Sequence, residues 1–289
     1  MNVIVIGGAT ASGKTSLAVR LAEKYDGEVV SADALLVYKE LNIGTAKPTE
    51  EEKRGIPHYM IDVADPTENF SVCDYERLAL PIVEDILSRG KTPIICGGTG
   101  FYVKSLLFKS QFGNAPASEK IREKYKKIVE EKGASFLHSL LRACDEESAE
   151  KLHENDVKRV IRALEIYELT GKKKSEQSDK EIPRFPYKAY AIDFPREELY
   201  ERINRRVDVM FERGLPEEVL SLLSRGIDES RQCMQAIGYK EICKGIRTGA
   251  TTDEMKESIK TNTRNYAKRQ LTFFKKFPEI QWIKKDETL

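Results

Sequence analysis

Residues 8–15, which read Gly-Ala-Thr-Ala-Ser-Gly-Lys-Thr, have the residue types and spacing of a phosphate-binding loop, G-x-x-x-x-G-K-[ST]. The two glycines permit backbone angles that turn successive N–H groups toward an anion, and a following helix presents its N-terminus to the same anion. Lys14 would add a full positive charge, and the Thr15 hydroxyl would ligate Mg²⁺. We therefore predict a polyphosphate site made of Gly8, Ala9, Thr10, Ala11, Ser12, Gly13, Lys14 and Thr15.

Asp33 and Thr99 follow the ends of two other predicted strands, residues 28–32 and 92–96. Ligands of open α/β sheets bind beyond the carboxyl ends of the strands, so we expect both side chains beside the phosphate loop. Thr99 belongs to a second glycine turn, Gly-Gly-Thr-Gly at 97–100, which predicts a second wall of the anion pocket. Two alternatives stay open, because Asp33 could be a turn former or N-cap and a glycine turn can serve packing alone. The absence of an acid at the end of strand 92–96 disfavours nucleotide hydrolysis.

A helix predicted over residues 196–213 supplies an arginine to the same site. At about 100° per residue its apolar side chains form one arc, made of Leu199, Ile203, Val207, Met210 and Phe211. Arg205 lies opposite this arc, whereas Arg206 lies at its shoulder. A guanidinium partly buried there needs a carboxylate or a bound phosphate to offset its desolvation. Arg206 is therefore the better candidate of the pair.

The elements that position these residues alternate between short apolar strands and helices, which predicts an α/β fold. We expect a parallel sheet like that of the P-loop NTPases, flanked by helices, with an inserted all-α domain. The catalytic core is placed at residues 1–112 and 186–289, and the helical insertion at 113–185. Pro81 is expected to kink or split a helix over residues 71–87.

The predicted insertion consists of charged helices over residues 118–132, 135–143, 146–153 and 157–170. On the last helix one face is apolar, formed by Val157, Val160, Ile161, Leu164 and Tyr167. Basic side chains that could contact an extended polyanion are Arg122, Lys158, Arg159 and Arg162. Charged helix faces are usually only solvated, but the accumulation of these residues in one module favours such contact.

The last long helix is predicted to begin at a capping box, Thr251 with Glu254. Basic residues then recur every four positions, at Lys256, Lys260, Arg264 and Lys268. The sequence therefore predicts a second basic stripe, on this helix.

Composition limits the classes of function. The chain has 289 residues, a formal net charge of +1 and 40% hydrophobic residues, which is typical of a globular protein without global attraction to nucleic acid or membrane. The five cysteines are scattered, without a C-x-x-C pair, which argues against a disulfide framework and a zinc site. The chain begins directly with a strand and has no apolar run of membrane-spanning length, so we expect a cytoplasmic protein.

Together these motifs resemble one family, the tRNA dimethylallyltransferases (isopentenyl-tRNA transferases). The resemblance extends over nearly the whole chain in the family's order, in the stretches Gly8–Thr15, Ser31–Tyr38, Asn42–Pro48, Asp65–Ser71, Gly97–Leu107, Asn155–Gly171, Arg205–Gly214, Gln235–Glu241 and Thr263–Phe274. It is therefore far more specific than a phosphate loop alone.

The resemblance implies transfer of a five-carbon allylic group from dimethylallyl diphosphate to the exocyclic amine of the adenosine 3′ to the anticodon. Asp33 would then be the general base, Thr99 would contact the diphosphate bridge or the amine, and Arg206 would help the phosphate loop hold the diphosphate. Mg²⁺ would offset the charge of the diphosphate. Residues implied in tRNA binding are Asp33, Ala34, Leu35, Leu36, Arg122, Lys158, Arg159, Arg162 and Lys240.

The partners implied are dimethylallyl diphosphate and a tRNA anticodon stem-loop, with no membrane and a monomeric enzyme. Ala34 replaces a usual serine and Leu36 a frequent glutamine of the family, which bears on base recognition rather than on the chemistry. Two other enzymes would share much of this pattern. One is a transferase that prenylates free adenine nucleotides, and the other is a P-loop small-molecule kinase; a non-catalytic RNA-binding protein is disfavoured by Lys14, Thr15 and Asp33.

Overall fold

The computed structural model describes residues 2–109, 117–176 and 182–284, and across these residues the chain forms two compact units. One unit comprises residues 1–108 and 183–289, and the other residues 109–182. The boundary placed at residue 113 from the sequence falls outside the described residues. The core resumes at 183, whereas the sequence analysis placed this point at 186.

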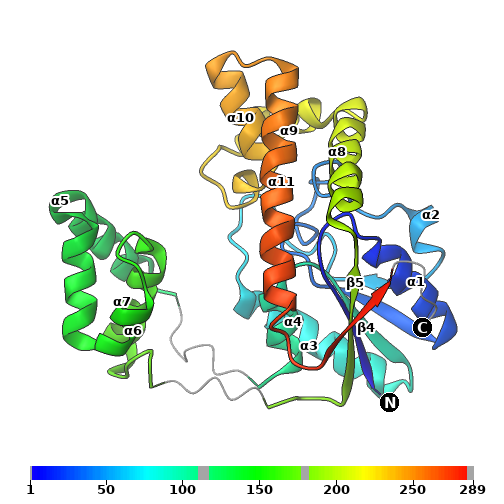
Figure 1. Ribbon diagram of the computed structural model, residues 1–289, viewed down its shortest axis with the longest axis horizontal. Coiled ribbons are helices and arrows are strands. Elements are labelled where there is room, and N and C mark those ends of the chain that lie inside the picture. The colour runs from blue at the N-terminus through cyan, green and yellow to red at the C-terminus, as the bar shows by residue number, and fades with distance from the viewer. Residues whose placement is uncertain (1, 110–116, 177–181, 285–289) are drawn as a thin grey trace. The chain divides into compact units, whose positions relative to one another are not determined.

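A parallel sheet forms the centre of the first unit (Figure 1). Within the described residues it has six strands, β1 (Val3–Gly7), β2 (Gly27–Ser31), β3 (His58–Tyr59), β4 (Thr92–Cys96), β5 (Tyr187–Asp193) and β6 (Ile280–Lys284). The strand order is β3-β2-β4-β1-β5-β6, and every pairing is parallel. The predicted parallel α/β sheet is confirmed. Since β4 lies between β1 and β2, the loops that follow these three strands are neighbours.

Helices cover both faces of the sheet, as a parallel sheet requires. The helices of this unit are α1 (Lys14–Lys24), α2 (Glu50–Lys53), α3 (Val72–Ser88), α4 (Gly100–Leu107), α8 (Arg196–Glu212), α9 (Leu215–Ser224), α10 (Tyr239–Thr248) and α11 (Thr252–Phe274). Alternate residues of β1 point to opposite faces, so that Ile4 packs with Leu17 of α1 and Val5 with Val83 of α3 and Val103 of α4. None of the described helices is both long and apolar enough to cross a bilayer.

One expectation about helices needs correction. α3 continues through Pro81, so the predicted split is wrong; buried Ala79 and Val83 hold the helix against the sheet on both sides of the proline. The capping box of Thr251 with Glu254 is present at the start of α11. The basic stripe on α11 is not uniformly exposed, however, because α11 runs beside α8 (Figure 1). Lys260 pairs with Asp208 of α8 at 3.0 Å, which buries most of its side chain.

The second unit is helical, with α5 (Glu119–Cys144), α6 (Glu146–Lys151) and α7 (Val157–Thr170). Gly133 interrupts α5 with a φ of 83°, so this helix corresponds to the two helices expected over 118–132 and 135–143. The predicted apolar face of α7 is buried at Val160, Ile161 and Leu164, but Tyr167 is exposed near the end of the helix.

Candidate active site

The phosphate loop, Asp33 and the second glycine turn follow β1, β2 and β4, so they share the carboxyl edge of the sheet. Hydrogen bonds join the last two directly. The Thr99 N–H donates to the Ala32 carbonyl at 3.0 Å, and the Ala34 N–H donates to the Thr99 hydroxyl at 3.0 Å. The structure therefore brings Thr99 beside Asp33.

The phosphate loop bends through three residues with positive φ, namely Gly8 (123°), Ala11 (62°) and Gly13 (88°). Inside the loop, the Ser12 hydroxyl and the Lys14 ammonium donate to the Ala9 carbonyl. Gly13 is the N-cap of α1 and offers no side-chain cap to the first N–H groups of the helix. This leaves a cationic side chain and a helix N-terminus at one point, an arrangement suited to anion binding.

Asp33 lies close enough to Lys14 and Arg206 to influence the pKa of each. Burial of the ammonium lowers the pKa of Lys14 to about 8; Arg206 acts in the same direction, whereas Asp33 favours the charged form. Burial likewise lowers the pKa of Arg206 below its ordinary value, and the Asp33 carboxylate opposes this. Asp33 and Lys14 follow β2 and β1 at the same carboxyl edge of the sheet, and the charge of Asp33 reaches Lys14, as a reaction between a diphosphate and a general base requires.

α8 presents its arginines as the helical wheel predicts. Arg205 is exposed, whereas the Arg206 guanidinium points to the Thr10 hydroxyl at 3.4 Å. A second contact, which the sequence analysis missed, is made one turn earlier by Arg202, whose Nε donates to the Ala11 carbonyl at 2.7 Å. Two arginines of α8 thus approach the phosphate loop.

α11 also reaches the site, through two residues that the sequence analysis missed. The Gln270 amide accepts a hydrogen bond from the Thr10 N–H at 2.8 Å and donates one to the Gly98 carbonyl at 3.1 Å. Tyr266 lies against Thr99 and Gln270, and burial raises its pKa well above the usual value. One sequence signal could have found Gln270: it is a polar residue at the spacing of the buried apolar positions Ala267 and Phe274.

The glycines of the second turn are required for steric reasons. A Cβ at Gly97 would overlap the Ala32 backbone, one at Gly98 would overlap the Gln270 amide, and one at Gly100 would overlap the Phe273 ring. Among these, none has a positive φ. The packing alternative left open for this turn therefore holds, while its role as an anion wall stays a prediction.

The turn after Asp33 also combines two roles. The carboxylate oxygen Oδ1 of Asp33 accepts a hydrogen bond from the Leu35 N–H at 2.9 Å, so Asp33 is a turn former as well as a neighbour of Lys14. Ala34, Leu35 and Leu36 form a partly exposed turn beside it.

The basic residues of the insertion fall into two groups. Arg122 and Arg162 both bind the fully buried Glu165. Burial opposes ionisation of this carboxyl, but hydrogen bonds from the Ser118 N–H and the two guanidiniums hold its pKa below the usual range. Arg122 and Arg162 are thus part of the internal packing of the insertion, a role that the sequence analysis did not foresee.

Lys158 and Arg159 make up the second group and are exposed at the start of α7. The Arg159 guanidinium lies 3.4 Å from the Asp156 carboxylate. Lys240, in the other unit, is exposed beside Glu241 at 3.6 Å. Of the predicted RNA-binding cations, these three are exposed, whereas Arg122 and Arg162 are partly buried.

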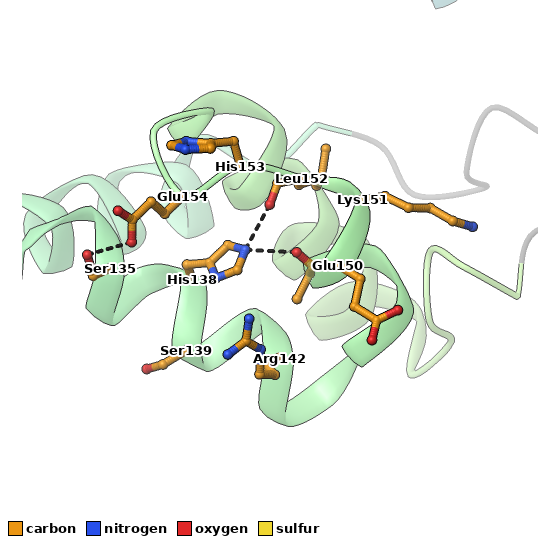
Figure 2. A pocket seen from close by; sticks show the side chains of 10 residues that line it. Ser135, His138, Ser139, Arg142, Glu150, Lys151, Leu152, His153 and Glu154 are labelled. Atoms are coloured by element: carbon orange, nitrogen blue, oxygen red, sulfur yellow. Dashed lines mark hydrogen bonds between the residues drawn. The ribbon is translucent and has the colours of Figure 1, made fainter.

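A hollow of about 660 Å³ lies within the insertion, between the second half of α5 and α6 (Figure 2). His138 points into it and contacts the Ala149 and Leu152 carbonyls at 3.0 and 2.9 Å. None of the site residues expected from the sequence lines this hollow.

Thr15 is the candidate metal ligand. Over the described residues no group of three or more His, Cys, Asp or Glu side chains could hold a metal ion. Mg²⁺ at phosphate sites takes only one or two protein oxygens, the rest coming from phosphates and water. The Thr15 hydroxyl, exposed in the first turn of α1 beside Lys14, is such an oxygen. This donor set suits Mg²⁺ carried on a polyphosphate.

A parallel sheet with a phosphate loop after β1 defines a P-loop α/β protein. Comparison with known proteins narrows the class. A family model described as IPP transferase matches residues 36–277. A tRNA dimethylallyltransferase of Acetivibrio thermocellus is 48% identical over 289 residues, covering 99% of this chain and 92% of the relative. The chain belongs to the IPP transferase family.

Comparison with solved structures gives the same family. The chain is similar to the full-length tRNA isopentenylpyrophosphate transferase of Bacillus halodurans, with 40% identity and a TM-score of 0.74 over 98% of this chain and 90% of the other. It is also similar to a eukaryotic dimethylallyltransferase acting on tRNA, with 32% identity and a TM-score of 0.83 over 98% of this chain and 74% of the other.

Proposed function

We propose that this protein transfers the dimethylallyl group of dimethylallyl diphosphate to the exocyclic amine of the adenosine 3′ to the anticodon in tRNA, releasing diphosphate. The observation that carries the proposal is that Asp33 and the phosphate loop with Lys14 lie at the same carboxyl edge of the sheet, where Arg206 also contacts the loop at Thr10. A base for the incoming amine thus faces cations for the departing diphosphate. Family membership supplies the substrates.

In this reaction the amine nitrogen forms a bond to the allylic carbon while the bond from that carbon to the diphosphate oxygen breaks. The phosphate loop, Lys14 and Arg206 stabilise the charge that develops on the leaving oxygen. Mg²⁺, held by the Thr15 hydroxyl and the diphosphate, would neutralise part of that charge. Asp33 takes the proton from the amine, and Thr99, beside Asp33, contacts the amine or the diphosphate bridge.

The target adenosine must leave the anticodon loop to reach Asp33. The turn of Ala34, Leu35 and Leu36 is placed to contact the displaced base. Lys158, Arg159 and Lys240, which are exposed, would bind phosphates of the anticodon stem-loop.

The function is tested by incubating the protein with dimethylallyl diphosphate, Mg²⁺ and an anticodon stem-loop RNA, followed by mass analysis of the nucleosides. The control RNA carries guanosine at the position 3′ to the anticodon. Prenylated adenosine in the first RNA alone supports the proposal. Transfer to free AMP but not to RNA, or phosphate transfer from ATP to an acceptor, would overturn it in favour of the adenylate transferase or the kinase.

Asp33→Asn tests the base within the same assay. Loss of a general base should lower kcat by about 10²–10⁴ while the RNA dissociation constant stays within two-fold. An unchanged kcat would remove Asp33 from the mechanism.

The RNA contacts are tested by a double variant, Lys158→Ala with Arg159→Ala. Filter binding at several salt concentrations should show weaker binding and a shallower salt dependence. Lys151→Ala is the matched control, because Lys151 is an exposed lysine of the same insertion that already pairs with Glu147. Equal affinity in the double variant and the control would exclude α7 as a phosphate contact.

A further inference from the structure

Gln270 joins the two loops between which the proposed reaction takes place. Its side chain is buried, with 4% of the residue exposed, on the face of α11 that packs against the sheet. It accepts the Thr10 N–H of the phosphate loop at 2.8 Å and donates to the Gly98 carbonyl of the second glycine turn at 3.1 Å. Since β1 and β4 are adjacent strands, this one side chain bridges the two loops that follow them.

The chemistry of this bridge requires a primary amide. The Thr10 N–H is a donor, so its partner must accept a hydrogen bond. The Gly98 carbonyl is an acceptor, so its partner must donate one. A glutamine supplies both, a glutamate can only accept, and a methionine of similar length does neither effectively. The turn is also shaped for this approach, because a Cβ at Gly98 would overlap the Gln270 amide nitrogen.

The bridge bears on the spacing of the reacting groups. The phosphate loop would hold the leaving diphosphate, while Thr99, in the second turn, is hydrogen-bonded to the residue after Asp33. Tyr266, one helical turn before Gln270, lies against both Thr99 and Gln270. A displacement of the reacting atoms by about 1 Å can cost about 10²-fold in rate. A contact that sets the distance between the two loops is therefore expected to affect the chemical step.

We propose that Gln270 is a positioning residue that fixes the phosphate loop relative to the Thr99 turn and so aligns the diphosphate with the base and the acceptor. This inference rests on the proposed function and adds to it a residue outside both loops. Gln270 does not touch the reacting atoms and acts through Thr10 and Gly98.

The test uses Gln270→Glu, which keeps the shape and the acceptor but removes the donor, and Gln270→Met, which removes both without adding charge. Gln281→Glu on β6 is the matched control, because it makes the same substitution at an exposed glutamine. With dimethylallyl diphosphate and stem-loop RNA, we expect kcat to fall at least ten-fold in both Gln270 variants. KM for RNA should stay within two-fold, and the control should match the wild type.

Either of two results would overturn the inference. One is a kcat within two-fold of the wild type in folded Gln270→Met. The other is a loss of kcat accounted for entirely by an equal loss of folded protein or of RNA affinity, as a merely structural role would produce.

Failure of the proposed function is distinguished by a second measurement that needs no transfer. Pyrophosphate with Mg²⁺ should raise the Tm of the wild type and of Gln281→Glu more than that of either Gln270 variant, because the phosphate loop is displaced in those variants. If the wild type does not prenylate RNA, the proposed function fails, and this shift alone decides the role of Gln270. Equal shifts in all four proteins would then refute it.

Discussion

The two glycine turns at the carboxyl edge of the sheet are similar in sequence and differ in the reason for their glycines. In the phosphate loop, Gly8 and Gly13 have φ values of 123° and 88°, and a Cβ at Gly13 would meet nothing within 4 Å. In the second turn, Gly97 and Gly98 lack positive φ but have no room for a Cβ. The first turn needs glycine for its backbone conformation, and the second for close packing.

This difference assigns different tasks to the two turns. The phosphate loop has open space at Gly13, directly before Lys14, and its conformation is held from outside by Arg202, Arg206 and Gln270. The second turn is filled by its neighbours and places Thr99 beside Asp33. Substitutions in the first turn should therefore affect ligand binding and catalysis, and those in the second should affect folding.

Among substitutions in the two turns, the largest effect on catalysis is expected from Lys14→Met. This variant removes the full charge that faces the diphosphate and should lower kcat/KM for dimethylallyl diphosphate by about 10²–10³, as for loss of one donor to a developing anion. Steady-state transfer to stem-loop RNA measures it, and thermal unfolding should show little change. A large loss of stability with normal kcat/KM would contradict the role of the phosphate loop in ligand binding and catalysis.

Gly97→Ala should instead destabilise the fold. The added Cβ would overlap the Ala32 backbone, which cannot move without breaking the pairing of β2 with β4. Overpacking of this kind should lower the free energy of unfolding by about 3 kcal/mol, measured by urea denaturation. If Gly97→Ala is as stable as the wild type, the steric explanation of the second turn is wrong.

The pH dependence of pyrophosphate binding contains a contribution from Lys14. Its pKa is lowered to about 8 by burial, so the ammonium is charged below that pH and loses its proton above it. Affinity should therefore fall as pH rises through 8, by about ten-fold between pH 7 and pH 9 for a ligand that needs the charged form. Lys14→Arg is the control, because its side chain stays charged over this range. Any pH dependence that remains in this variant comes from the ionisation of pyrophosphate itself, and the additional ten-fold fall should be absent.

Gly13→Ala should destabilise the fold less than Gly97→Ala. The added methyl group meets open space, and the cost is that of a left-handed backbone angle, about 1 kcal/mol. Urea denaturation beside Gly97→Ala measures the contrast. A cost at Gly13 equal to or larger than that at Gly97 would contradict the distinction between the turns.

The sequence by itself determined the parallel α/β fold, the phosphate loop and the choice of Arg206 over Arg205. Each depends on local spacing: a strand–glycine–helix order, the motif at residues 8–15, and the position of a side chain on one helical wheel. Such patterns survive in the sequence because neighbours along the chain remain neighbours in the structure.

Only the tertiary structure decided which side chains are hydrogen-bonded or ion-paired to residues far away in the sequence. Gln270 is 260 residues from Thr10 in the chain, and Arg122 meets Glu165 across 43 residues. No spacing rule connects such positions, so the bridge at the site was missed and two arginines of the insertion were assigned to RNA alone. The partial burial of the basic stripe on α11 was missed for the same reason, since the burial of Lys260 depends on how α8 packs against it.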